Sequence, residues 1–106
     1  MRRLIFNVLL AALLAGCGTH YTRSDGNDVI LILRNPQAKQ VVLTCSLDGF
    51  KSRSAKMVAG RWEVRLPADE AFRYFYRVDD EIFLPDCPLK ESDDFGSQNC
   101  IFDPYL

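Results

Sequence analysis

Short runs of alternating apolar and polar residues fill the chain from residue 29 onward. In residues 72–78, for example, Phe, Tyr, Tyr and Val alternate with Arg, Phe and Arg. A two-residue period places successive side chains on opposite faces of a strand, and no segment beyond residue 16 keeps the 3.6-residue period of a helix over ten residues. The pattern therefore predicts an all-β protein, an antiparallel β-sandwich. The predicted strands cover residues 29–34, 41–47, 61–66, 72–78, 81–84 and 99–102.

The same alternation predicts which aromatic side chains are buried. Trp62 shares its face with the apolar residues of its own strand, so we expect it in the core rather than on a sugar-binding platform. Tyr74 and Tyr76 share the buried face of their strand. Phe75 has the opposite parity and lies between two arginines. It could stack on a planar or sugar-like ligand, or fill the sheet surface through cross-strand contacts.

The first sixteen residues have the pattern of a cleaved signal peptide. Arg2 and Arg3 precede an apolar run from Leu4 to Leu14, and the small residues Ala15 and Gly16 follow. This is a basic n-region, a short h-region and a cleavage point. A helix needs about 20 apolar residues to span a bilayer, so the run is too short to remain as a membrane anchor.

The residues Leu14-Ala15-Gly16-Cys17 resemble the lipobox of bacterial lipoproteins. In that family the cysteine thiol receives a diacylglyceryl group, the chain is cut before the cysteine, and the new amine is acylated. The resemblance implies that Cys17 carries lipid, including palmitate, and two or more acyl chains give a stable membrane anchor. Gly18 in place of Asp resembles the sorting pattern of lipoproteins in the outer membrane, facing the periplasm. The alternative is an ordinary secretory signal with an unmodified cysteine.

Domain boundaries follow from composition. Residues 17–28 are polar, contain two glycines and show no period, so they predict a lipidated cysteine followed by a flexible tether. The sandwich domain is then predicted at 29–103. Within it, residues 51–56 predict a loop or an edge, and residues 85–98 predict a long polar loop.

Removal of residues 1–16 leaves 90 residues with 11 Lys and Arg against 14 Asp and Glu, a net charge of about −3. The signs are read as interspersed. Because no basic patch that would neutralise phosphates is evident, nucleic acid is not an expected partner. A domain of this size buries only about 60% of its unfolded surface and is marginally stable without further support.

Disulfide bonding could supply that support. Three cysteines follow Cys17, and an exported protein lies where disulfides persist. We expect Cys87 to pair with Cys100 across a short polar loop, stabilising the domain by about 3 kcal/mol. Cys45 lies in an apolar alternating run and is expected to be a buried free thiol. A zinc site would want CxxC or His partners at ligand spacing, and neither is present.

Residues 41–102 resemble a known family of sugar-binding domains. The resemblance is carried by the run 41–50, by Gly60-Arg61-Trp62, by the run 74–80, and by Asp94-Phe95-Gly96 with Asn99. These segments are similar, in order and spacing, to the glycogen-binding module of AMP-activated kinase β-subunits and to the early-set domain of isoamylases and branching enzymes. The resemblance implies an immunoglobulin-like early-set sandwich that binds α-glucans or accompanies a catalytic domain.

The resemblance also assigns ligand-binding positions. Phe50 and Ile82 stand where sugar-binding members carry tryptophans that stack on glucose rings, and an isoleucine cannot stack. Phe75 stands in place of a lysine that bonds sugar hydroxyls, and Phe95 in place of a leucine in the binding loop. Asn99 is kept. From the residues alone, Phe50 could equally pack at the domain rim, and Phe95 could plug its loop.

Catalytic chemistry finds little support in the sequence, so we expect no enzyme. His20 is the only histidine and falls in the predicted tether, where it would not be held in a rigid site. Neighbouring acidic residues on a strand point to opposite faces and cannot act as a glycosidase pair. Asp86, Asp93 and Asp94 could hold Ca²⁺, yet no EF-hand spacing exists. No metal site and no cofactor are therefore predicted.

Two classes of function remain open. The first is an envelope protein that is anchored by lipid and uses the sandwich as a protein-interaction or structural scaffold, with the Phe75 face or a strand edge contacting a partner chain. The second is a carbohydrate-binding module for an α-glucan, in which Phe50, Phe75, Phe95 and Asn99 form the site. The replaced tryptophans favour the first class, and the retained asparagine favours the second.

Overall fold

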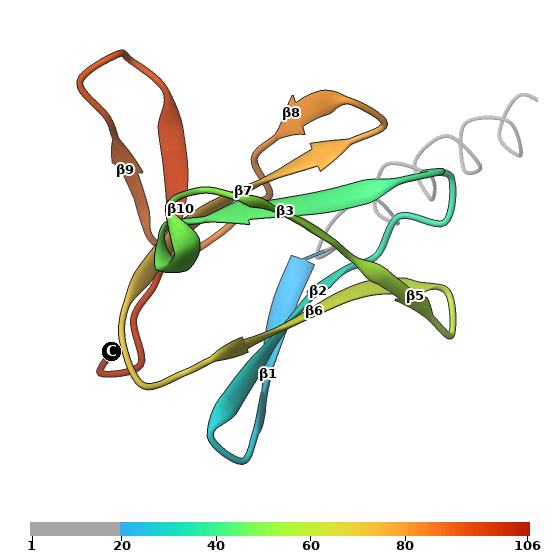
Figure 1. Cartoon of the computed structure of the whole chain (residues 1–106), viewed down its shortest axis with the longest axis horizontal. Coiled ribbons are helices and arrows are strands. Elements are labelled where there is room, and N and C mark those ends of the chain that lie inside the picture. Colours follow the sequence, from blue (N-terminus) through green and yellow to red (C-terminus); the bar gives the residue numbers. More distant parts are fainter. Residues whose placement is uncertain (1–19) are drawn as a thin grey trace, which may run out of the picture.

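Two antiparallel sheets pack face to face over residues 20–106, the part of the chain that this computed structural model describes (Figure 1). The predicted signal peptide and Cys17 lie outside the described residues. The four-stranded sheet has the order β1 (His20–Asp25), β2 (Asp28–Leu33), β6 (Arg61–Pro67) and β5 (Lys56–Val58). The six-stranded sheet has the order β4 (Ser52–Ser54), β3 (Val41–Cys45), β7 (Phe72–Val78), β10 (Gln98–Phe102) and β9 (Lys90–Ser92), and β8 (Glu81–Phe83) pairs with β7.

The strand order is that of an immunoglobulin-like sandwich. β1, β2, β6 and β5 take the places of strands A, B, E and D, and β3, β7 and β10 take those of C, F and G. β4 adds an edge strand beside β3, and β8 and β9 are inserted between the F-like and G-like strands. The predicted all-β, immunoglobulin-like antiparallel sandwich is confirmed for the described residues.

The core is built from the inward-facing residues of both sheets. Leu31 and Leu66 of the four-stranded sheet and Leu43, Phe72 and Tyr76 of the six-stranded sheet are almost completely buried. Trp62 packs against this core as predicted, and its indole Nε1 donates a hydrogen bond to the main-chain oxygen of residue 35 over 3.0 Å. Alternate residues of the strands are therefore buried in the core, as a two-residue period predicts.

Residues 20–25 form strand β1, so the prediction of a flexible tether as far as residue 28 is wrong for this segment. The strand pairs along its whole length with β2, from His20 beside Leu33 to Asp25 beside Asp28. Gly26, in the left-handed region with φ 61°, allows the two-residue turn between them. The strand escaped prediction because its inward positions are His, Thr and Ser rather than apolar residues. The sandwich therefore includes residues 20–28 in addition to the predicted 29–103.

Two predicted loops also contain strands. β4 and β5 lie on either side of Ala55, and the chain crosses there from the edge of one sheet to the edge of the other. The main-chain N–H of Ala55 donates to the oxygen of Val41 over 2.8 Å. β9 lies inside the segment 85–98 and pairs with β10. The side chains of these short edge strands are largely exposed, so the strands need no apolar face and alternation does not reveal them.

The cysteine predictions are confirmed. Cys87 and Cys100 form a disulfide that ties the segment before β9 to strand β10. Cys45 is a free thiol with no exposed surface, and burial raises its pKa. The thiol is therefore protonated and inert, as a buried structural cysteine is expected to be.

Candidate functional site

The outer face of the six-stranded sheet carries the residues that alternate with its core. Since Tyr74 and Tyr76 point into the sandwich, Phe75 of β7 points outward. The strand register places Thr44 of β3 beside Phe75 and Ile82 of β8 beside Arg77. We call this surface the outer face.

A hollow of about 510 Å³ opens on the outer face between the β7–β8 hairpin and the β9–β10 hairpin. Both hairpins project to the same side of the molecule (Figure 1). Three of the five residues predicted to bind ligand come together here: Phe75 is half-buried, Ile82 is 68% exposed, and Asn99 is 7% exposed. The hollow is lined by Phe75, Ile82, Leu84, Asp93, Gly96, Ser97, Gln98 and Asn99.

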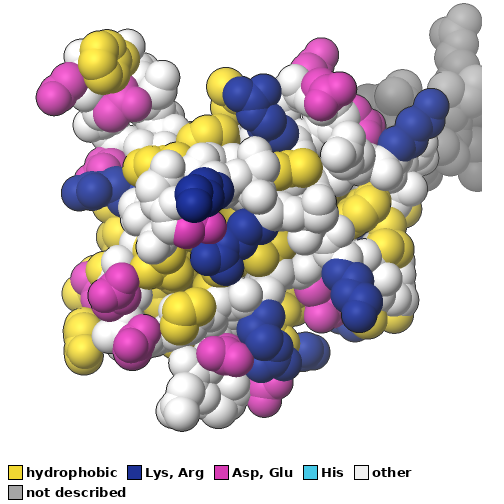
Figure 2. All heavy atoms as spheres, viewed as in Figure 1, with side chains coloured by type: hydrophobic (Ala, Val, Ile, Leu, Met, Phe, Trp, Pro, Cys, Tyr) yellow, Lys and Arg dark blue, Asp and Glu magenta, His cyan; other side chains and the backbone are white. Residues whose placement is uncertain are grey.

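The other two predicted residues lie outside this hollow. Phe95 is 92% exposed in the loop between β9 and β10. Its loop is held by Asp93, whose Oδ1 accepts hydrogen bonds from the main-chain N–H groups of Phe95 (2.8 Å) and Ser97 (2.9 Å). At the tip of this hairpin, Figure 2 shows a hydrophobic group among acidic side chains. Phe50 follows the short 3₁₀ helix η1 (Ser46–Asp48) with a φ of 64° and is 43% exposed.

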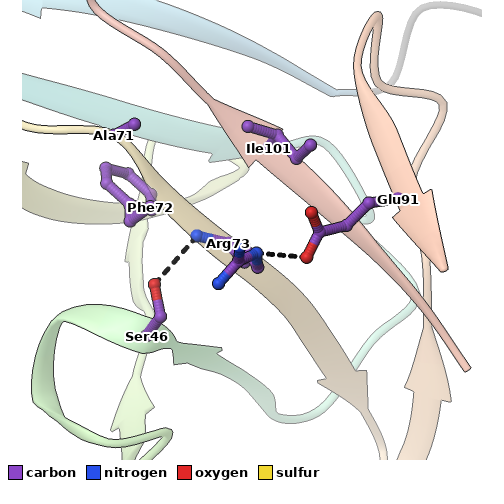
Figure 3. Close-up of a pocket in the computed structure, with 6 residues that line it drawn as sticks. All are labelled: Ser46, Ala71, Phe72, Arg73, Glu91 and Ile101. Atoms are coloured by element: carbon purple, nitrogen blue, oxygen red, sulfur yellow. Dashed lines mark hydrogen bonds and ion pairs between the residues drawn. The ribbon is translucent and has the colours of Figure 1, made fainter. Parts of the chain in front are cut away.

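A second hollow, of about 320 Å³, lies farther along the same face (Figure 3). Arg73 forms an ion pair with Glu91 across it, and the main-chain N–H of Arg73 donates to Ser46 Oγ over 3.0 Å. Ile101 lies beside Arg73 in the strand register. One of the two arginines that flank Phe75 in sequence is thus engaged with a carboxylate instead of being free for a ligand.

His20 lies at a cleft that sequence reasoning missed. Its imidazole Nε2 is 3.0 Å from the hydroxyl of Tyr76, and its ring centroid is 5.4 Å from that of Tyr76 and 5.8 Å from that of Tyr74. The cleft has a volume of about 440 Å³ and lies between β1 and the C-terminal part of the six-stranded sheet. Leu89 and Phe102 also line it. The Gly26-Asn27 turn was the available sequence signal, since this dipeptide between two short runs indicates a hairpin.

Burial controls the chemistry of this histidine and its partners. Desolvation lowers the pKa of His20 to about 4 and raises the pKa of Tyr74 to about 12. The pKa of Tyr76 is also raised by desolvation. At neutral pH the imidazole is therefore uncharged and both phenols keep their protons. The expectation that His20 is not held in place is wrong, but its partner is an unreactive phenol rather than a nucleophile.

Within residues 20–106, no three His, Cys, Asp or Glu side chains gather as a metal ion would require. No helix in the same residues is long and apolar enough to cross a membrane. The fold and the outer face together define an immunoglobulin-like β-sandwich module with an apolar hollow on one sheet. No protein-family model matches the chain, and no curated protein matches it. Function is therefore inferred from the residues themselves.

Proposed function

We propose that this chain is an exported, lipid-anchored and non-catalytic module of the cell envelope, which binds a partner protein on its outer face. The observation that carries the proposal is the hollow between the two hairpins, where Phe75 and the exposed Ile82 lie together. Clustered apolar side chains on the surface of a monomer mark an interaction site. Lipid attachment at Cys17 remains an inference from the lipobox pattern.

The apolar content of this region supports a protein partner. Ile82 is exposed on the β7–β8 hairpin and Phe95 on the β9–β10 hairpin, and both hairpins border the hollow. Full burial of such a side chain contributes about 1.5–3 kcal/mol, so a partner that covers both of them gains substantial affinity. β8 also pairs only with β7, so its other edge offers main-chain groups to a partner.

The charge of the residues around the hollow indicates which kind of partner surface would bind there. Residues 79–103 contain eight Asp and Glu and a single lysine, Lys90. This segment supplies β8, β9, β10 and the loops around the hollow. A complementary partner surface is apolar at its centre and basic at its rim, because charge complementarity steers association and excludes like-charged competitors.

The chemistry of the described residues supports a binding role rather than a catalytic one. In residues 20–106 the single histidine contacts two tyrosines, and the single free thiol is buried. Neither group has the nucleophile–base geometry of covalent catalysis. The acidic residues Asp79 and Asp80 form the β7–β8 turn, where Asp79 Oδ1 accepts hydrogen bonds from the N–H groups of Lys39 and Gln40, both at 2.9 Å.

A second function, binding of an α-glucan, is favoured by one observation. Asn99, the polar residue kept in the resemblance to glycogen-binding modules, lines the same hollow as Phe75. An aromatic face beside an amide is a usual arrangement for a sugar ring. Ile82 stands in that hollow where a stacking tryptophan would be, which weakens the affinity expected for glucan.

Site-specific photo-crosslinking in living cells tests the proposal. A photoreactive residue at position 82 should capture one dominant partner, which mass spectrometry identifies. The matched control is position 57, because Met57 is also exposed but lies on the four-stranded sheet. With the purified partner, Phe75→Ala should weaken binding about ten-fold or more through loss of an anchoring aromatic.

Titration calorimetry with maltoheptaose separates the two functions. We expect no heat of binding from the wild-type chain. Saturable binding of maltoheptaose that Phe75→Ala abolishes, together with equal crosslinking at positions 82 and 57, would replace the protein-partner function with the glucan-binding one.

A further inference from the structure

Charge is segregated along the sequence, between residues 20–67 and residues 79–103. Residues 20–67, which contain the four-stranded sheet together with β3 and β4, hold eight Lys and Arg against four Asp and Glu, a net of +4. Residues 79–103 hold one against eight, a net of −7. The prediction that positive and negative residues are interspersed along the chain is therefore wrong. The net charge of the whole chain is small because a basic segment and an acidic segment largely cancel.

A hollow of about 450 Å³ with basic walls lies where the four-stranded sheet meets the edge strand β4. Arg23, Arg53, Lys56 and Arg65 line it, and Glu63 is the one carboxylate among its lining residues. The register places Arg23 and Arg65 on either side of Ile30 of β2, which is 3% exposed. We call this site the basic hollow.

Two of these cations are already neutralised and two are not. Arg65 pairs with Asp25 (2.5 Å) and Asp28 (3.1 Å), and Arg53 pairs with Asp48 (2.8 Å). Among the described residues, Arg23 and Lys56 form no ion pair. Nearby, Arg61 donates to the hydroxyl of Tyr21 over 2.9 Å, so its charge is also not matched by a carboxylate. Within residues 20–106, the basic hollow thus offers an anion two cations without an ion pair, Arg23 and Lys56, with Arg61 nearby, against one carboxylate without an ion pair, Glu63.

We propose that the basic hollow docks on the anionic phospholipid headgroups of the membrane that anchors the chain. This inference rests on the proposed lipidation of Cys17. His20 follows Cys17 by three residues, and three residues span at most about 10 Å. Because His20 is held in β1 by its contacts with two tyrosines, the start of this sheet lies close to the lipid. Clustered Lys and Arg beside a membrane anchor bind anionic lipid.

A bilayer fits these observations better than a soluble polyanion does. A free nucleic acid would meet the repulsion of the acidic segment 79–103 from most directions of approach. The anchor, in contrast, holds the basic hollow at the headgroups continuously. With the four-stranded sheet toward the bilayer, the outer face of the six-stranded sheet points away from it. The proposed partner site is then presented to the periplasmic space.

Vesicle binding by a chain without lipid tests this directly. The mature-length chain with Cys17→Ser, exported through a secretory signal so that its disulfide forms, is sedimented with lipid vesicles. One set contains phosphatidylcholine only, and the other contains phosphatidylcholine and phosphatidylglycerol at three to one. The mature net charge of about −3 predicts repulsion from anionic vesicles. An oriented basic hollow instead predicts a partition coefficient about ten-fold higher on the anionic set, which falls as salt is added.

Charge-reversal variants locate the contact. The pair Arg23→Glu and Lys56→Glu should return binding to the level of phosphatidylcholine vesicles. The matched control is the pair Lys39→Glu and Lys51→Glu, which makes the same change in net charge at exposed loop positions outside the hollow and should keep most of the binding. Circular dichroism confirms that each variant is folded.

Three outcomes would overturn the inference. They are equal binding to the two vesicle sets, equal losses from the two charge-reversal pairs, and competition by a short DNA duplex as effective as competition by anionic vesicles. None of them bears on whether Cys17 is lipidated, because the chain in this experiment carries no lipid. Failure of the docking inference and failure of the anchor are therefore distinguishable.

Discussion

The imidazole of His20 lies where the two sheets meet, 3.0 Å from the Tyr76 hydroxyl and beside the ring of Tyr74. It fills the position that an apolar residue would occupy in a typical first strand. A neutral histidine can do this because one face of its ring is apolar and its nitrogen finds a hydroxyl. The position therefore depends on the imidazole remaining uncharged.

Stability should consequently fall as the solution becomes acidic. The pKa of His20 is about 4 in the folded chain, against an ordinary value of 6.5. Between these values the unfolded chain binds more protons than the folded one, so the free energy of unfolding decreases as pH falls from 6.5 to 4. Because the ring is partly exposed, we expect a loss of about 2 kcal/mol, measured by urea unfolding at successive pH values.

The variant His20→Gln provides the control, since it keeps hydrogen-bonding groups and does not titrate. It should be less stable than the wild type at pH 7, and its stability should change little between pH 6.5 and 5. His20 is the only histidine in the sequence, so no other side chain titrates ordinarily in that interval. An equal slope in both proteins would show that His20 is not buried in the neutral form.

Whether the environment of a residue could be predicted from the sequence depends on which contacts hold that residue in place. The disulfide and the buried thiol were predictable, because cysteine spacing and apolar alternation report on them separately. The burial of Tyr74 and Tyr76 followed from parity alone. His20 was not predictable in this way, because its burial depends on a hydroxyl 56 residues away. Local sequence carries no record of such a partner.

Strand β1 is the element that differs most from expectation, and it covers one face of the fold. It pairs with β2 over six residues, and β2 is buried along almost its entire length. Without β1, the unpaired edge of β2 would expose a run of Val, Ile and Leu. A strand edge of this kind favours aggregation.

Deletion of residues 20–25 should therefore strongly destabilise the domain, whereas deletion of a flexible tether would leave its stability unchanged. We expect the shortened chain to lose about 3 kcal/mol or more of unfolding free energy and to aggregate on heating. The loss combines six paired residues with the contact between His20 and Tyr76. Deletion of only Gly18 and Thr19 serves as the control, because it shortens the chain before β1. Equal urea midpoints for the two deletions would restore the tether interpretation.

Whether a strand could be located from the sequence depends on whether it has an apolar face. β3, β6 and β7 alternate apolar and polar residues, and each was located within a residue or two. β4, β5 and β9 have three residues each and are largely exposed, so only their pairing with longer strands defines them. Their partners are fixed by the topology of the whole sandwich, which alternation does not specify.

At the scale of the whole molecule, the two sheets carry different surfaces. The four-stranded sheet presents the basic hollow, and the six-stranded sheet presents the apolar hollow bordered by acidic hairpins. The immunoglobulin-like order sets these surfaces back to back. Under the proposals made above, the first surface would face the membrane and the second would bind the partner protein.

The candidate site was only partly predictable from the sequence. Phe75, Ile82 and Asn99 came together because β8 and β10 both pair with β7, the strand that carries Phe75. Phe50 and Phe95 lie outside the hollow because η1 and the β9–β10 loop direct them elsewhere. Charge segregation was visible in the sequence only when counted by segment.

The intact mass of the mature protein, extracted from membranes and measured by mass spectrometry, tests the central claim most directly. A module anchored as proposed has a chain that begins at Cys17, with a diacylglyceryl group on its sulfur and a third acyl chain on its amine. The Cys17→Ser variant should lack this modification and leave the membrane fraction. A mature mass with no lipid, or a chain that begins elsewhere, would contradict the account.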